Sequence, residues 1–232
     1  MKLTLNHIQE LYKFTRKHYV EYYDVQTELV DHLANDIEQI LEVNPNFSFE
    51  EARDKSFKKF GVFGFMDVVE KKEWQMTKKY LKLVWKLILE WFRLPKIVLT
   101  IVLTFAFYEL QQFEFAHAFY MTVSFTLMTS LLVIMFIRAK KLSKKYKETG
   151  KKWMLEQIIN VNGLANVFFL LYWFYEFPFS NQKDFLVMGD FRKILSALII
   201  TLTLILAHIM FRVIPKKADE LLQETYPEYK LS

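Results

Sequence analysis

Three long stretches without Asp, Glu, Lys or Arg constrain this chain more than any other feature of its sequence. They cover residues 115–137, 158–175 and 194–211. An α-helix rises about 1.5 Å per residue, so about 20 apolar residues cross the roughly 30 Å hydrocarbon core of a bilayer. We therefore expect each of these stretches to form a transmembrane helix.

A fourth apolar stretch, residues 94–110, contains charged residues only near its ends, at Lys96 and Glu109. Long polar side chains near a helix end can reach the headgroup region, so this stretch is also predicted to span the membrane. A soluble bundle of four such helices would lack the polar faces that water requires. The predicted spans are about 94–113, 115–137, 157–177 and 192–213, preceded by a basic amphipathic helix over 76–93 and followed by a tail over 215–232.

The distribution of Lys and Arg predicts the orientation of these spans. Residues 138–157 carry eight basic residues against two acidic ones, whereas residues 111–114 carry no basic residue. Loops rich in Lys and Arg remain in the cytoplasm. Four crossings would then place both termini in the cytoplasm. Near the N-terminus, Lys13, Arg16 and Lys17 precede any apolar run of signal-peptide length, so we expect no cleaved signal peptide.

The first 75 residues have the pattern of a small, water-soluble helical domain. Apolar residues recur at helical spacing between Val25 and Leu41, and an earlier helix is expected over about 5–19. Ser48 and Glu51 form a capping box at the start of a third helix, and Gly61 is placed to end it. The predicted fold is therefore all-α, with a small cytoplasmic helical domain followed by a four-helix transmembrane bundle.

Three ordered pieces of this domain resemble a known family. The segments 28–38 (ELVDHLANDIE), 49–53 (FEEAR) and 60–61 (FG) are similar to the permease-prefix, or HAAS-type, helical domain of bacterial membrane proteins. The resemblance implies that residues 1–75 are a cytoplasmic signalling or protein-interaction module of a bacterial inner-membrane protein. It also implies a PadR-type transcription regulator as a candidate partner. The permeases of that family carry a long domain after the first crossing, which this chain lacks.

Polar residues of the first helical domain are the candidates for contact with a cytosolic protein. His32 either contacts such a partner or fastens its helix to a neighbouring helix, and the structural role is favoured. The resemblance assigns no catalytic role to it. The candidate partner-binding residues are Glu28, Asp31, His32 and Asp36.

Basic side chains between the second and third predicted spans are candidates for contact with anionic lipid headgroups. Each Lys or Arg near such a surface contributes about 1 kcal/mol of binding free energy. Because the topology already explains this charge, nucleic acid is not expected as a partner. The candidate headgroup contacts are Lys140, Lys141, Lys144, Lys145, Lys151 and Lys152.

Polar residues inside the predicted spans are expected to join helices. Asn160, Asn162 and Asn166 are predicted to make interhelical contacts, and small residues at 118, 122, 126 and 130 suit close packing within the chain or with a second copy. Glu114 and His117 have a spacing found in metal-binding bundles, but no facing pair completes a site. With no cysteine and no catalytic motif, we expect no metal, no cofactor and no enzymatic activity.

The sequence leaves two classes of function open. The leading hypothesis is a regulatory or adaptor protein, in which four helices anchor a domain that binds a cytosolic protein. The alternative is a transporter, or an accessory subunit of a transport complex, in which the three asparagines line a polar path across the membrane.

Overall fold

The computed structural model describes residues 2–163, 187–226 and 229, and its regular elements in these ranges are all helices, as the sequence predicts. The chain divides into two compact units. The N-terminal unit comprises Met1–Lys79 together with Lys145–Gln157, and the hydrophobic unit comprises Tyr80–Lys144 and Ile158–Lys230. Each unit is described by itself.

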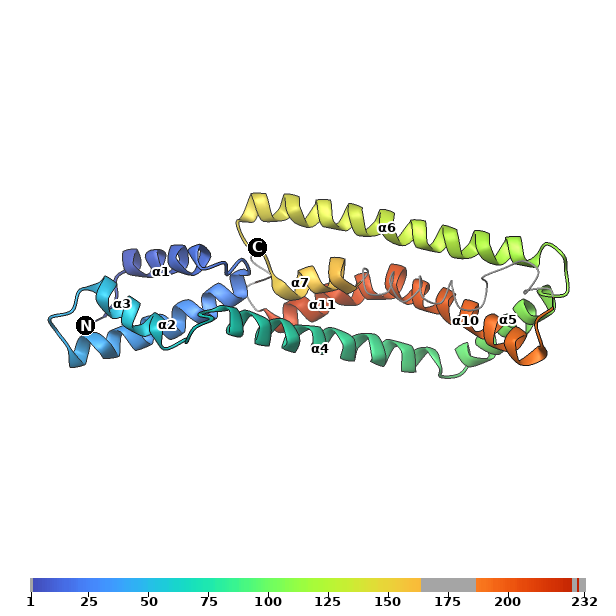
Figure 1. Cartoon of the computed structure of the whole chain (residues 1–232), viewed down its shortest axis with the longest axis horizontal. Helices are drawn as coiled ribbons and strands as arrows, with labels where there is room; N and C mark the ends of the chain where they lie inside the picture. Colours follow the sequence, from blue (N-terminus) through green and yellow to red (C-terminus); the bar gives the residue numbers. More distant parts are fainter. Residues whose placement is uncertain (1, 164–186, 227–228, 230–232) are drawn as a thin grey trace. The chain divides into compact units, whose positions relative to one another are not determined.

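Three helices and the start of a fourth form the first part of the N-terminal unit (Figure 1). They are α1 (Leu5–Lys17), α2 (Tyr23–Val43), α3 (Phe49–Lys58) and α4 (Met66–Trp91). Both α1 and α3 pack against α2, which makes α2 the central element of this unit.

The apolar stripe that the sequence predicts on α2 forms the core of the N-terminal unit. Val25, Leu33 and Ile37 are fully buried, and the other stripe residues are at most 7% exposed. Residues three and four positions apart share one helix face, so a single face of α2 is covered by its neighbours. The polar residues between them lie on the remaining surface of the helix.

The predicted start of α3 is confirmed in detail, and the helix ends at Lys58, three residues before the predicted stop at Gly61. The Ser48 hydroxyl accepts a hydrogen bond from the Glu51 amide, and the Glu51 carboxylate accepts one from the Ser48 amide at 2.8 Å. Gly61 has a φ of 76°, the left-handed conformation expected where the chain turns after a helix. On α3, Ala52 and Ser56 are buried and Phe57 is half-buried.

The expected boundary near residue 75 falls inside a helix. α4 continues without a break from Met66 to Trp91, because no Gly or Pro interrupts this stretch, and the N-terminal unit ends within it at Lys79. α6 (Ala116–Thr149) likewise continues beyond the predicted span into the basic stretch and ends just before Gly150. The basic residues 138–147 are therefore helical.

The hydrophobic unit consists of long helices and their extensions. It contains α5 (Lys96–Leu110), most of α6, and α10 (Asp190–His208), which packs against α5. The last helix continues through a π-helical turn, η2 (Ile209–Val213), into α11 (Ile214–Thr225), so the predicted tail begins as a helix. A second π-helical turn, η1 (Ile158–Asn162), follows the short helix α7 (Met154–Gln157) of the N-terminal unit.

Within the described ranges, two helices are long and apolar enough to cross a membrane: α6, and the continuous helix Asp190–Thr225. α5 has 15 residues and therefore rises only about 22 Å, which is shorter than the predicted span 94–113 and than a typical hydrocarbon core. The predicted span 157–177 lies largely outside the described residues.

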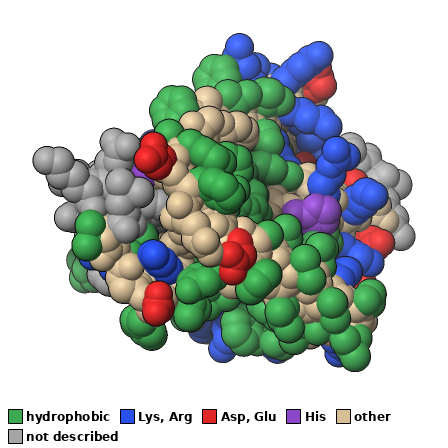
Figure 2. Space-filling model, turned by 90° about the vertical axis from the view of Figure 1, so that its right-hand side faces the viewer, with side chains coloured by type: hydrophobic (Ala, Val, Ile, Leu, Met, Phe, Trp, Pro, Cys, Tyr) green, Lys and Arg blue, Asp and Glu red, His purple; other side chains and the backbone are tan. Residues whose placement is uncertain are grey.

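Apolar side chains of the hydrophobic unit are widely exposed on its surface. Phe105 of α5 is 64% exposed, Phe125 of α6 is 71% exposed and Phe191 of α10 is 80% exposed. Hydrophobic side chains also cover much of the face shown in Figure 2. Exposed apolar patches of this kind mark surfaces that contact lipid or other protein.

A polar network fastens α5, α6 and α10 to one another. The Gln111 amide nitrogen donates to the Tyr120 hydroxyl oxygen at 3.1 Å and to the Lys193 carbonyl oxygen at 3.0 Å. The Ser196 hydroxyl donates to the Gln111 amide oxygen at 3.2 Å. Buried side-chain amides are stable only when they are hydrogen-bonded, and Gln111 is 3% exposed, so this network fixes the register of the three helices.

Candidate protein-binding groove

A groove of about 400 Å³ lies on the N-terminal unit between α2, the end of α3 and the start of α4. Its position follows from the packing of α3 against α2 and from the turn at Gly61, after which the start of α4 meets α2 through Val68 and the Lys72–Glu28 ion pair. The side chains that line it are Glu28, Leu29, His32, Asp36, Ser56, Lys59, Phe60 and Val68.

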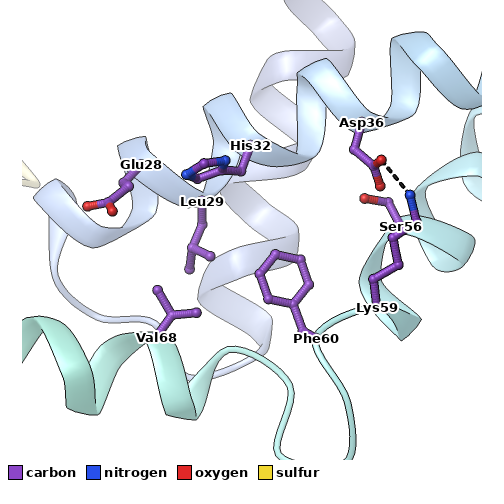
Figure 3. A pocket seen from close by; sticks show the side chains of 8 residues that line it. All are labelled: Glu28, Leu29, His32, Asp36, Ser56, Lys59, Phe60 and Val68. Atoms are coloured by element: carbon purple, nitrogen blue, oxygen red, sulfur yellow. Dashed lines mark hydrogen bonds and ion pairs between the residues drawn. The ribbon is translucent and has the colours of Figure 1, made fainter.

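The floor of the groove is apolar. Leu29 of α2, Phe60 of the α3–α4 connection and Val68 of α4 point toward one another inside it (Figure 3). Leu29 is 1% exposed, whereas Phe60 and Val68 are half-buried and still reach solvent. This floor offers a partner a place to bury an apolar side chain.

Charged side chains surround this floor. Asp36 of α2 forms an ion pair with Lys59, and Glu28 forms one with Lys72 of α4. Burial acts to raise the pKa of Asp36, but hydrogen bonds from Lys59 and Ser56 outweigh it and hold that pKa below its ordinary value. Asp36 therefore stays ionised at neutral pH, and its contribution to stability is present above its ordinary pKa and lost as the pH falls through the lowered value.

The structure brings together three of the four predicted partner-binding residues. Glu28, His32 and Asp36 line the groove from successive turns of α2, whereas Asp31 lies on the exposed surface of the same helix and does not line it. His32 is exposed at the groove rather than fixed inside the helix packing. It is therefore placed to contact a partner.

The half of the groove that lies outside α2 was not predicted from the sequence. Its residues are Ser56 of α3, Lys59 and Phe60 of the α3–α4 connection and Val68 of α4, and they meet α2 only through tertiary packing. From the sequence, the FG pair at 60–61 was interpreted as part of the family resemblance, and its glycine as the end of a helix. Its phenylalanine also forms part of the apolar floor.

The distribution of acidic residues in the sequence also indicates the charge of one wall of the groove. Residues 18–52 contain nine acidic residues and no Lys or Arg. α2 lies in this stretch, so its wall of the groove and the adjoining surface around Asp31 are acidic. On the opposite side of the groove, the lining residue that follows α3 is basic, Lys59, and the last turn of α3 also carries Lys55 and Lys58, which do not line the groove.

The predicted lipid contacts fall into two groups. Lys140, Lys141 and Lys144 are exposed on α6, as contact with headgroups requires. Lys145, Lys151 and Lys152 instead have protein partners within the N-terminal unit, which are Glu156 for Lys145, the Tyr23 ring for Lys151 and Glu21 for Lys152. Contact with lipid stays a prediction for both groups.

The predicted interhelical asparagines lie at the edge of what the structure describes. Asn160 and Asn162 belong to η1, and the Asn160 side chain is half-buried. Asn166 lies outside the described residues. Among the described helices, Gln111, Tyr120 and Ser196 join α5, α6 and α10, and no spacing pattern in the sequence predicted this role for Gln111.

Among the residues that the structure describes, Glu114 and His117 belong to no larger set of acidic and histidine side chains that could hold a metal ion. In the described part of the chain, no group of three or more His, Asp or Glu residues is arranged to hold a metal ion. The groove combines an apolar floor with fixed charges at its edge, which is an arrangement suited to binding a protein segment.

Comparison with protein families, with curated proteins and with solved structures returned no match.

Proposed function

We propose that this chain is a non-catalytic membrane protein with a regulatory or adaptor role, whose N-terminal unit binds a cytosolic protein. The observation that carries the proposal is the groove of the N-terminal unit, where an apolar floor opens to solvent beside the acidic surface of α2. Two helices that are apolar enough to cross a membrane support the membrane location.

The proposed topology has four crossings, with both termini in the cytoplasm of a bacterium and the hydrophobic unit in its inner membrane. The excess of Lys and Arg in residues 138–157 supports this orientation. The resemblance of residues 1–75 to the permease-prefix domain supports the bacterial setting. It also makes a PadR-type regulator a candidate partner.

The chemistry of the groove specifies the partner segment. An amphipathic helix can place one apolar side chain against Leu29, Phe60 and Val68 and a Lys or Arg beside Glu28. Glu28 suits this contact because it lines the groove and 43% of its side chain is exposed. Opposite charges at such a surface guide association and fix the register of the bound segment.

The test is site-specific photo-crosslinking of the full-length protein in cells. A benzoylphenylalanine at position 32, where the native histidine is exposed and lines the groove, should capture the partner, whereas one at Gln39, which is exposed on α2 and does not line the groove, should not. With the purified partner, His32→Lys should weaken binding about tenfold and Gln39→Lys should leave it unchanged. Equal crosslinking at both positions, or unchanged binding by His32→Lys, would contradict the proposal.

A further inference from the structure

Residues 150–157, between α6 and η1, pack against the N-terminal end of α2. Gly150 ends α6 with a φ of 67°, a left-handed conformation that lets the chain turn sharply after Thr149. The segment then passes the α1–α2 connection and enters α7, and all of these residues belong to the N-terminal unit. A loop that the sequence assigns to the membrane surface is therefore part of the folded N-terminal unit.

Residues 150–157 and the start of α2 are joined by two hydrogen bonds, and each segment donates one backbone amide to the other. The Tyr23 amide, the first of α2, donates to the Lys152 carbonyl oxygen at 2.7 Å. The Met154 amide, the first of α7, donates to the Asp24 carboxylate at 3.2 Å. The first amides of a helix have no partner inside it, and Tyr22 provides no side-chain cap, so the Lys152 carbonyl supplies the partner that α2 lacks.

Buried side chains provide the apolar part of this contact. Trp153 is 3% exposed, and its ring meets the Tyr23 ring edge to face with 5.2 Å between the centroids. The burial of this large aromatic ring contributes to the free energy that holds the segment in place.

Charged side chains surround this apolar contact. Lys152 forms an ion pair with Glu21 at 2.6 Å, and the Lys151 ammonium lies 4.6 Å from the centre of the Tyr23 ring. Lys145 pairs at 3.2 Å with Glu156, whose side chain is only 10% exposed. The basic stretch 138–152 therefore meets the acidic stretch 18–52 at this point, which fixes the register of the contact.

We propose that residues 150–157 are a latch, through which the loop after α6 holds the start of α2. α6 is one continuous helix, apolar enough to cross a membrane, and it leads into the latch with only the turn at Gly150 between them. Movement of the end of α6 then opens or closes the latch and frees or caps the first turn of α2. This inference does not depend on the partner of the groove.

Hydrogen exchange of the full-length protein in nanodiscs tests the latch directly. The readout is the peptide that contains Tyr23, because the amide of this residue is bonded to the latch. Trp153→Ala should speed exchange there at least about tenfold. The matched control, Trp74→Ala, removes a tryptophan of the same unit that is 65% exposed, and it should change nothing.

A charge reversal separates opening of the latch from general unfolding. Lys152→Glu should speed exchange at Tyr23 about two- to fivefold, because a carboxylate at position 152 would then face the carboxylate of Glu21. The double variant with Glu21→Lys should restore the original rate, and Lys147→Glu, an exposed lysine of the same unit, should have no effect. The latch would be refuted if Trp153→Ala behaved like Trp74→Ala, or if the double variant failed to restore the rate.

Discussion

His18 is surrounded by aromatic rings at the end of α1. Its imidazole centre lies 4.5 Å from that of Phe14, 4.3 Å from that of Phe57 and 5.9 Å from that of Phe65. Burial lowers the pKa of His18 below its ordinary value of 6.5, and the charges of Lys17 and Arg53 lower it further, while Asp54 opposes them. A protonated imidazole is therefore less favourable in the folded N-terminal unit than in the unfolded chain.

The lowered pKa of His18 makes the folded N-terminal unit less stable in acid. The unfolded state binds the His18 proton more readily, so His18 costs no stability above pH 6.5 and destabilises the fold as the pH falls from 6.5 through the lowered pKa. Hydrogen exchange of α1 and α3 in the full-length protein, compared at about pH 8 and about pH 5.5 after correction for the intrinsic rate, measures this loss. His18→Phe should reduce the difference, and an equal pH response in both proteins would contradict the prediction.

Gly163 is a second position where a single residue determines the packing. A Cβ added there would lie 2.6 Å from Cζ of the Tyr80 ring, and Tyr80 is 3% exposed. A contact this close forces the ring or the helix to move. No other residue type fits at position 163 while the ring of Tyr80 keeps its place.

Gly163→Ala should therefore lower the unfolding free energy by about 1–3 kcal/mol, as overpacking of a core does. Thermal unfolding in detergent measures the change, with Gly189→Ala as the control, because nothing lies within 4 Å of a Cβ at that position. In a Tyr80→Leu background the cost should shrink, since the two sites are coupled. An equal cost in both backgrounds would show that the ring is not the cause.

At the scale of elements, the helices of the hydrophobic unit are held in register by one amide. Gln111 follows the last residue of α5 and bonds to groups of both α6 and α10. Its side chain is buried at the α5–α6 turn rather than exposed to solvent. Loss of this amide would leave the Lys193 carbonyl and the Ser196 hydroxyl without one of their partners.

Gln111→Leu should lower the unfolding free energy by about 1–3 kcal/mol, because buried polar groups would lose hydrogen bonds. The neighbouring variant Gln112→Leu is the control, since Gln112 is exposed and bonds only locally to Glu109. Thermal unfolding of the two variants in the same detergent gives the comparison. Equal stability of the two would show that the network contributes nothing to the helix packing.

At the scale of the whole molecule, a polar N-terminal unit is joined to a unit that exposes many apolar side chains. In the N-terminal unit, Lys145–Gln157 packs with residues 1–79 although more than sixty residues separate them in the sequence. The fold therefore places a loop between two apolar segments in the same compact unit as the start of the chain. This loop should lie on the same side of the membrane as residue 28.

Cysteine labelling tests this arrangement without interference, because the chain contains no cysteine of its own. A membrane-impermeant maleimide added to intact cells should label Gln112→Cys, in the turn between α5 and α6, and should not label Glu28→Cys or Lys147→Cys. All three positions should react once the membrane is opened. Labelling of position 28 or 147 from outside would overturn the proposed topology.

Local signals in the sequence predicted the helices and several of their ends. The apolar stripe of α2, the Ser48 capping box and the turn at Gly61 depend on residues within one or two helical turns, so their spacing alone was sufficient. The extent of α4 and α6 was misjudged because hydropathy changes along a helix without ending it. Helices end where Gly, Pro or a cap interrupts the backbone hydrogen bonds.

Tertiary packing alone decided which of these helices share a site. Lys59 and Val68 join α2 in the groove, Trp153 packs against Tyr23, and Gln111 bonds to Ser196, although no spacing rule connects these positions. The sequence by itself therefore determined an all-helical chain with a polar start and long apolar segments. The groove, the latch and the polar network depended on the folded chain, because contacts between distant residues arise from the packing of whole helix faces.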